Sequence, residues 1–264
     1  RDLHELSAAV DIATRASRNA AAIVEEHMEG REVGIDCIIG QSDIHIVMTK
    51  SRRKIRSIEP NQHQIFGCMW PLRLSEPLLD QVKEAARNIT RAFGLRNGPL
   101  MIQGIVVEER FYVIEFGARI GGGESDRIIR LATGLDMIEV GINSFLGRPI
   151  CEDFRAPREL FADNFLYVSP DTFGSITGYE DLLEDGTIEY MDWYKPAGTR
   201  IGVELSSNNR VGVFTVKGRN EDEIRVKIDK VINAIDVTSD HGESILRRGL
   251  YHDGVSDSLS SVQS

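Results

Sequence analysis

The stretch QGIVVEERFYVIEFGARIGGGESDR, residues 103–127, largely decides what this chain can fold into. Two apolar runs flank a charged turn, which predicts a β-hairpin. With a three-residue loop EER, Val107 pairs with Phe111 and Gln103 faces Glu115. Directly opposed side chains have Cβ atoms about 5 Å apart, so an amide and a carboxylate oxygen can share a hard cation such as Mg²⁺. An ordinary hairpin with a surface Gln–Glu pair is the alternative.

A cation and a glycine run follow the hairpin. Gly117 lies on the same face as Glu115 without a side chain, and Arg119 comes next, where its guanidinium fork can bind a phosphate oxygen. The run Gly121–Gly123 lets backbone N–H groups approach an anion closely, just before a predicted helix start. A flexible turn is the other interpretation of the glycines.

Composition limits the remaining possibilities. A chain of 264 residues with 41% apolar content can form one or two domains with sizeable cores. The net charge of -10 argues against a general nucleic-acid partner or an anionic membrane surface. No apolar run is long enough for a membrane span. Three cysteines without metal-ligand spacing, together with no visible signal peptide, indicate reduced thiols in a cytoplasmic protein.

Periodicity predicts the other elements. We expect helices over 2–17, from the cap Ser75 to Phe93, over 125–146 with a break near Gly134, and over 221–235 after the cap Asn220. We expect hairpins over 33–49 and 99–116, and strands at 164–168, 187–194, 199–205 and 210–217. The basic run SRRKIR, residues 51–56, is predicted to be a solvated loop, and the last dozen residues, 253–264, to be disordered.

A charged segment, VEEHMEGREVGID, precedes the first predicted strand. Glu25 and Glu32 lie seven residues apart and flank Met28 and a glycine. An extended hinge of this kind can offer backbone groups to a purine edge and leave an acid for ribose hydroxyls. A charged linker between domains is the alternative.

These three elements, in this order, resemble the second half of the ATP-grasp fold, the nucleotide-binding unit of carboxylate–amine ligases. The resemblance covers about residues 1–149. The family's adenine hinge, roughly E-x-x-x-x-G-x-E, is matched by EEHMEGRE. The resemblance implies that Glu25 and the backbone around Glu26 and Met28 face adenine, and that Glu32 holds the ribose.

The family's metal-binding strands carry an acid and, about a dozen residues later, E-x-N-x-R. Gln103 and the EFGAR motif occupy these places, so the resemblance implies that Gln103 and Glu115 bind Mg²⁺, or Mn²⁺ in its place. Two residues depart from the pattern, because Gln103 replaces an acid and Gly117 replaces an asparagine. We therefore expect a metal site that is less charged than is usual in the family.

The rest of the chain is similar to the accessory domain that follows the ATP-grasp unit in L-amino-acid ligases. The similarity rests on the G-x-I-x-G-x-E-x-L opening at Gly174, the step from Lys195 to Gly198, and the turn Asn-Arg-Val-Gly. Lys195, Arg200 and Arg210 are interpreted as structural or solvated. We expect an α+β protein with an antiparallel sheet and packed helices in a domain over 1–152, a small α+β accessory domain over 153–252, and a tail over 253–264.

The resemblance implies an ATP-dependent ligase that joins a small-molecule carboxylate to an amine through an acyl phosphate, with no nucleic-acid or membrane partner. Arg119, Gly122 and Gly123 would stabilise the charge on the transferred phosphoryl group. Glu124 and Arg127 either face the acceptor pocket or cap the helix. A carboxy-phosphate-forming enzyme of the carboxylase or carbamoyl-phosphate type and a non-catalytic ATP-binding module are the alternatives. The oligomeric state is left open, with a homodimer among the options.

The position of the lysines leads to one more expectation. In ATP-grasp ligases, lysines N-terminal to the hinge contact the phosphates, but no lysine precedes Glu25 here, and the first is Lys50. The chain also begins with Arg1 rather than Met, which suggests a fragment that lacks the N-terminal part of the fold. We therefore expect weak nucleotide binding and negligible turnover from this chain alone.

Overall fold

The computed structural model describes residues 3–41, 43–54, 65–203 and 206–252. The pattern of internal contacts divides the chain into residues 1–30 and residues 31–264. In the first unit, the predicted N-terminal helix is present as α1 (Leu3–Ala16), and none of its residues is buried. Residues 21–29, which include most of the predicted hinge, have no regular secondary structure.

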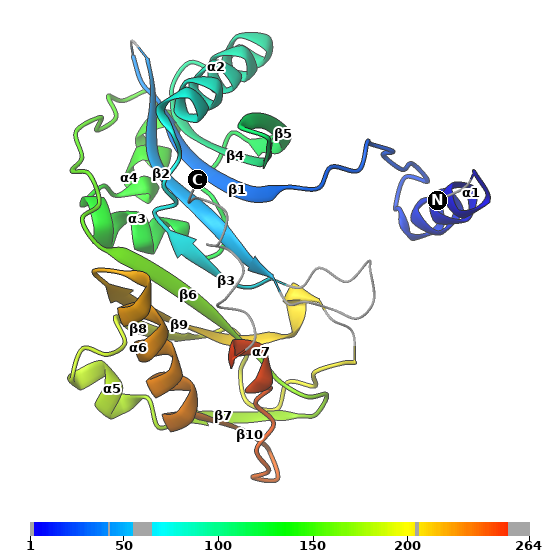
Figure 1. The fold of residues 1–264 in the computed structure, drawn as a ribbon, viewed down its shortest axis with the longest axis vertical. Coiled ribbons are helices and arrows are strands. Elements are labelled where there is room, and N and C mark those ends of the chain that lie inside the picture. Colours follow the sequence, from blue (N-terminus) through cyan, green and yellow to red (C-terminus); the bar gives the residue numbers. More distant parts are fainter. Residues whose placement is uncertain (1–2, 42, 55–64, 204–205, 253–264) are drawn as a thin grey trace. The chain divides into compact units, whose positions relative to one another are not determined.

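The second unit is built on an eight-stranded antiparallel sheet with the order β5-β4-β1-β2-β3-β6-β9-β8, and a separate two-stranded sheet pairs β7 with β10 (Figure 1). The α+β class with a large antiparallel sheet is therefore confirmed. Strands that precede and follow residues 152 and 153 belong to the same sheet, because β3 pairs with β6. The strands are β1 (Arg31–Ile39), β2 (Ile44–Lys54), β3 (Ile65–Trp70), β4 (Gly98–Val107), β5 (Arg110–Gly117), β6 (Leu160–Tyr167), β7 (Phe173–Thr177), β8 (Tyr190–Trp193), β9 (Arg210–Gly218) and β10 (Asp236–Ser239).

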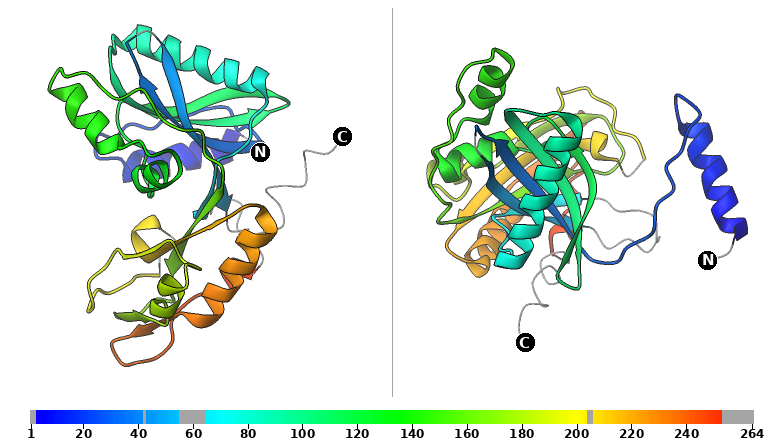
Figure 2. Two further views of the ribbon diagram at one scale, coloured as in Figure 1. Left: turned by 90° about the vertical axis from the view of Figure 1, so that its left-hand side faces the viewer. Right: turned by 90° about the horizontal axis from the view of Figure 1, so that it is seen from above.

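Helices cover both faces of the sheet (Figure 2). Alternate residues of β1 point to opposite faces: Ile35 packs in the core with α2, whereas Ile38 packs in the core with α3 and α4. A third core lies between α6 and the β6–β9 part of the sheet. The helices of this unit are α2 (Glu76–Phe93), α3 (Ser125–Thr133), α4 (Met137–Phe145), α5 (Glu180–Glu184), the 3₁₀ turn η1 (Ser207–Asn209), α6 (Glu221–Ala234) and α7 (Gly249–His252).

The predicted helix ends are confirmed for α2 and α6. α2 follows Ser75 at its N-cap, and it ends at Gly94, which has a left-handed φ of 63°. The Asn220 side chain accepts a hydrogen bond from the backbone N–H of Glu223, so it caps α6 as the sequence predicts. The break near Gly134 is also present, since α3 ends there and α4 begins at Met137.

The predicted turn of the β4–β5 hairpin is wrong by one residue. The loop has two residues, Glu108 and Glu109, with φ of 47° and 58°, and Val107 pairs with Arg110 rather than Phe111. This is the left-handed geometry that two-residue hairpin loops prefer. A β-bulge between Gln103 and Gly104 then shifts the register, so Gln103 still pairs with Glu115.

Four other predictions need correction or lie outside the described residues. SRRK, the first four residues of the basic run, continues β2 instead of forming a solvated loop; residues 55–56 are not described. Residues 199–203 form no strand beyond one bridge between Thr172 and Arg200, and 204–205 are outside the description. The predicted strand at 187–194 is confined to β8, and the predicted disordered tail, 253–264, is not described. Among the described helices, none combines the length and apolarity that crossing a bilayer requires.

Candidate functional site

A cleft of about 350 Å³ lies on the face of the sheet that carries the hairpin pair and the glycine run. Both Gln103 and Glu115 line it, together with Arg119, Gly122 and Gly123. The structure therefore brings together the predicted metal and phosphate-binding residues from β4, β5 and the loop before α3. The other lining residues are Gly34, Lys50, Arg52, Ile65, Cys68, Met101, Phe165, Tyr167, Ser207 and Arg210.

The charge of the cleft opposes the charge of the chain. Four cationic side chains line it, and Glu115 is the one carboxylate among the lining residues, whereas the whole chain has a net charge of -10. The cations are Lys50, Arg52, Arg119 and Arg210. A concave site with an excess of positive charge attracts and concentrates an anionic ligand. Burial raises the pKa of the Cys68 thiol to about 11, so the thiol is neutral at physiological pH.

The side chain of Lys50, on β2, holds the glycine loop in place. Its ammonium donates hydrogen bonds to Ser125 Oγ at 2.7 Å and to the carbonyl of Gly122 at 3.2 Å, and it lies 3.7 Å from a carboxylate oxygen of Asp36. Asp36 in turn accepts from the backbone N–H of Gly121 at 3.1 Å and from Ser125 Oγ at 3.3 Å. Asp36, Lys50 and Ser125 are all buried. This network ties β1, β2 and the start of α3 together, and it holds the glycine loop at the edge of the cleft.

Two glycines are required by this arrangement. A Cβ on Gly34 would lie 2.6 Å from Cε of Lys50, so the lysine side chain passes over β1 only because residue 34 has none. A Cβ on Gly121 would lie 2.1 Å from Oδ1 of Asp36. At Gly122, by contrast, a Cβ would meet nothing within 4 Å. The steric demand of the loop therefore falls on Gly121, where the backbone meets the buried carboxylate, and Gly123 has a left-handed φ of 64° that favours glycine.

Gln103, one of the two predicted metal ligands, is hydrogen-bonded to an arginine. The amide oxygen Oε1 of Gln103 accepts a short hydrogen bond from Nη2 of Arg52. The other terminal nitrogen of Arg52 lies 3.5 Å from a carboxylate oxygen of Glu32, which also accepts from Lys54. Glu115 is exposed on the edge strand β5, directly across from Gln103.

These donors do not fit a resident metal ion. Mg²⁺ prefers six oxygen ligands, and proteins usually supply one or two carboxylates. Among the described lining residues Glu115 is the one carboxylate, which meets only the lower end of that number, Gly117 offers no side chain, and a guanidinium already occupies the Gln103 oxygen, so a metal ion would find a single protein ligand. Within the described part of the chain, no three His, Cys, Asp or Glu side chains cluster as metal ligands do. The expected Mg²⁺ or Mn²⁺ site is therefore not supported by this geometry.

The predicted hinge residues divide between the two units. Glu25, Glu26 and Met28 belong to residues 1–30, where Glu25 and Glu26 are exposed and Met28 is half-buried. Glu32 lies on β1, where it is held between Lys54 and Arg52. Its role toward a ribose stays a prediction.

Glu124 and Arg127 are engaged with β8 and its flanking residues. Glu124 takes the N-cap position of α3 with φ of 60°, but its carboxylate accepts from the hydroxyls of Tyr194 at 2.5 Å and Tyr190 at 3.2 Å instead of capping the helix. Burial, followed by the contact with Glu124, raises the pKa of Tyr194. Arg127 stacks on Tyr190 and pairs with Asp192 at 3.1 Å. Neither residue lines the cleft; both connect the start of α3 to β8.

Arg210 is part of the cleft rather than a solvated side chain. Its guanidinium lies 3.8 Å from the ring centroid of Phe165 and donates to the hydroxyl of Tyr167 at 2.8 Å and to the carbonyl of Ile65 at 3.0 Å. The cation–π contact with Phe165 and the two hydrogen bonds fix the orientation of the guanidinium. The interpretation of Arg210 as structural is supported by these contacts, but the residue also lines the cleft.

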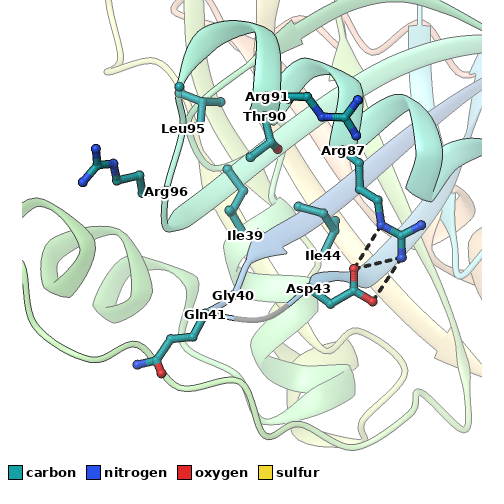
Figure 3. A pocket seen from close by; sticks show the side chains of 11 residues that line it. Ile39, Gly40, Gln41, Asp43, Ile44, Arg87, Thr90, Arg91, Leu95 and Arg96 are labelled. Carbon is teal, nitrogen blue, oxygen red and sulfur yellow. Dashed lines mark hydrogen bonds and ion pairs between the residues drawn. The ribbon is translucent and has the colours of Figure 1, made fainter.

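A second and larger groove, about 430 Å³, lies between the β1–β2 hairpin and the end of α2 (Figure 3). Its charged residues do not converge on a common point: Arg87 is paired with Asp43 at 2.9 Å, and Arg96 extends away from that pair. The groove contains neither the hairpin pair nor the glycine loop. Size alone would favour it, but the chemistry favours the smaller cleft.

The sequence interpretation missed Lys50 and Arg52 as site residues. Both belong to a strand in which every second residue, from Met48 through Lys50 and Arg52 to Lys54, points to the same face. This alternation was the available signal, because it continues past the apolar part of β2. The alternation was overlooked because a run of basic residues is usual in solvated loops.

Solved structures with a similar fold were found, whereas neither the protein-family models nor the curated proteins gave a match. A phosphoribosylglycinamide synthetase from Anaerococcus prevotii is 18% identical with a TM-score of 0.70, over 90% of this chain and 61% of that one. An L-amino acid ligase from Bacillus licheniformis is 21% identical with a TM-score of 0.70, over 90% and 60%. A biotin carboxylase from Campylobacter jejuni is 16% identical with a TM-score of 0.68, over 93% and 54%.

This chain therefore spans about 60% of the length of the first two structures. At these identities the likeness concerns the fold. It extends over nearly the whole chain, both before and after residue 152. The chain has the fold of these ligases and of the carboxylase, which is the ATP-grasp fold that the sequence resemblance implies.

Proposed function

We propose that this chain is part of an ATP-dependent carboxylate–amine ligase, which forms an amide through an acyl phosphate. The observation that carries the proposal is the cleft itself: four cations face one carboxylate beside a glycine loop held by a buried network. A triphosphate has the charge and size to match such a site. The similarity of fold to an L-amino acid ligase and a phosphoribosylglycinamide synthetase supports the reaction class.

In the proposed reaction, a carboxylate oxygen of the substrate attacks the γ-phosphorus of ATP, and the bond between that phosphorus and the β–γ bridging oxygen breaks. The amine then attacks the acyl carbon of the acyl phosphate, and inorganic phosphate leaves. Proteins assist phosphoryl transfer mainly by positioning groups and neutralising charge. Arg119 is suited to this role because its guanidinium lines the cleft and, among the residues that the structure describes, donates only to the carbonyl of Ile120.

The backbone N–H groups of Gly122 and Gly123 would supply the second contribution to phosphoryl transfer. Both residues line the cleft, and Lys50 holds the Gly122 carbonyl, which fixes the direction of the loop. Preorganised N–H donors stabilise developing negative charge without reorganising during the reaction. In this proposal Lys50 and Asp36 position the loop, and Glu32 on β1 receives the ribose.

A non-catalytic nucleotide-binding module is the second candidate. The contact between Arg52 and Gln103 favours it, because that contact occupies an oxygen that the ligase mechanism was expected to give to a metal ion. The two candidates agree that the cleft binds ATP, and they differ in whether a carboxylate substrate promotes cleavage of the nucleotide.

Two measurements on the purified chain test the proposal. Calorimetric titration should detect ATP binding, and Arg119→Met should weaken it, whereas Arg91→Met, in the other groove, should not. Release of ADP is then measured with pairs of amino acids and, separately, with bicarbonate. Release that depends on an amino acid supports the ligase, and release that depends on bicarbonate supports the carboxy-phosphate alternative. Because negligible turnover is expected from this chain alone, the absence of release favours the non-catalytic module only if the protein encoded by the whole open reading frame also shows none; no ATP binding at all refutes the proposal.

A further inference from the structure

The contact between Arg52 and Gln103 places a positive charge where a metal ion was expected. Arg52 comes from β2 and Gln103 from β4, the two strands that flank β1. Its guanidinium donates one hydrogen bond to the Gln103 amide oxygen and lies 3.5 Å from the Glu32 carboxylate on β1. The side chain is 23% exposed and lines the cleft. Two acceptors therefore hold it at the cleft wall.

The chemistry of Gln103 matches an arginine better than a metal ion. An amide oxygen is a neutral ligand that accepts from a guanidinium well, whereas a carboxylate at the same place would also attract a divalent cation. A guanidinium in contact with this oxygen repels any divalent ion that approaches it. Glu115, across the hairpin, is left as the one carboxylate among the described lining residues, and Gly117 adds no ligand.

A guanidinium can take over charge neutralisation at a polyphosphate. It carries a permanent charge and five N–H donors in a fixed fork, of which the contacts with Gln103 and Glu32 engage only part. Arg119 and Lys50 lie in the same cleft, so a triphosphate there would meet several cations. Gln103 and Glu32 then act as positioning residues, since they orient Arg52 rather than touch the phosphates.

We propose that Arg52, oriented by Gln103 and Glu32, supplies the positive charge at the triphosphate in place of a protein-bound divalent cation, so that ATP binds whether or not Mg²⁺ accompanies it. This inference rests on the proposed function, because it assumes that the cleft is the triphosphate site. It differs from that function in one measurable respect: the affinity for ATP should depend little on Mg²⁺.

The test is calorimetric titration of ATP in buffer with EDTA and in buffer with excess Mg²⁺. The wild-type chain should show affinities within about threefold of each other in the two buffers. Arg52→Met should lower the affinity in EDTA by about 10- to 100-fold, the range for losing a hydrogen bond to a charged group. Arg52→Lys keeps the charge but loses the fork of N–H donors, so its affinity in EDTA should lie between those of the wild type and Arg52→Met. Arg87→Met is the matched control, since Arg87 is also paired but lines the other groove, and its affinity should not change.

Gln103→Glu provides the complementary test. With two carboxylates facing each other on β4 and β5, and with the guanidinium also removed by Arg52→Met, the double variant should gain Mn²⁺ binding without nucleotide, measured by the loss of the free-ion signal in electron paramagnetic resonance. The wild-type chain should show no such binding. This readout does not depend on catalysis, and unfolding curves of each variant establish that the fold is retained.

The outcomes separate the inference from the proposed function. If the wild-type chain binds ATP in Mg²⁺ but loses more than about tenfold of its affinity in EDTA, the inference is overturned and the proposed function stands. An unchanged affinity of Arg52→Met in EDTA overturns it as well. If ATP binds under neither condition, the proposed function fails and this inference fails with it.

Discussion

The buried pair of Asp36 and Lys50 offers the clearest test of how the glycine loop is held. Asp36→Asn keeps the shape of the side chain, and its amide oxygen can still accept from the Gly121 N–H. The substitution removes the charge that faces Lys50 at 3.7 Å and leaves the ammonium in a place where the lysine side chain is only 7% exposed. The perturbation therefore isolates the electrostatic part of the network.

The expected loss follows from the distance and the burial. Two unit charges at this separation interact by about 4–5 kcal/mol at an effective dielectric constant of about 20. Removing one partner of a buried pair typically destabilises a protein by about 3–5 kcal/mol. We expect the free energy of unfolding of Asp36→Asn to fall within this range. Lys50→Met, which leaves a carboxylate that still accepts two hydrogen bonds, should lose somewhat less.

The assay is urea unfolding of the two single variants and the double variant, with linear extrapolation to water. The double variant should lose less than the sum of the single losses, with a coupling of at least about 1.5 kcal/mol. The pair of Asp43 and Arg87 is the control, because it is also an ion pair between two segments of the fold, but both side chains are more than 40% exposed. A coupling for Asp36 and Lys50 no larger than that of the exposed pair would refute the network as an organising feature.

Three further predictions concern the glycine loop, the buried carboxyl group of Asp163 on β6, and Arg119. Gly121→Ala should destabilise the chain by about 1–3 kcal/mol, the cost of forcing atoms into a packed place, whereas Gly122→Ala, which meets open space, should change urea unfolding little; equal losses would contradict the close approach to Asp36. Burial raises the pKa of Asp163 from 3.8 to about 7, so the free energy of unfolding of the wild type should fall as pH rises between these values. The stability of Asp163→Asn relative to the wild type should therefore rise by up to roughly 4 kcal/mol between pH 4 and pH 8; parallel pH profiles of the two proteins would refute this. Arg119→Met should weaken ATP binding about tenfold in calorimetry, and an unchanged affinity would remove Arg119 from the phosphate site.

The fold was largely predictable because its signals are local. Apolar periodicity and the cap at Asn220 identified α6, and Gly94 marked the end of α2. The hairpin pairing of Gln103 with Glu115 was predicted correctly for an incomplete reason, since the two-residue turn and the β-bulge change the count in opposite directions. A bulge depends on how the whole strand twists in the sheet, and no residue pattern in the sequence predicted the bulge between Gln103 and Gly104.

The cleft was predictable only in part because half of it depends on distant contacts. Glu115, Arg119 and the glycines form one continuous motif, and the structure brings them together. Lys50 is buried because Asp36, 14 residues earlier, and Ser125, 75 residues later, both meet its ammonium. A basic run does not show which of its residues will find such partners. For the same reason, the Arg52–Gln103 contact and its consequence for the metal site emerged only from the structure.

The central claim is that the cleft over β2, β4 and β5, not the larger groove at the end of α2, binds the triphosphate. Hydrogen exchange measured by mass spectrometry, with and without saturating ATP, tests it most directly. ATP should slow exchange in peptides covering residues 119–125, the glycine loop, and residues 48–54, while peptides covering 87–96 stay unchanged. Slower exchange in 87–96, with no change in the glycine loop, would contradict the claim.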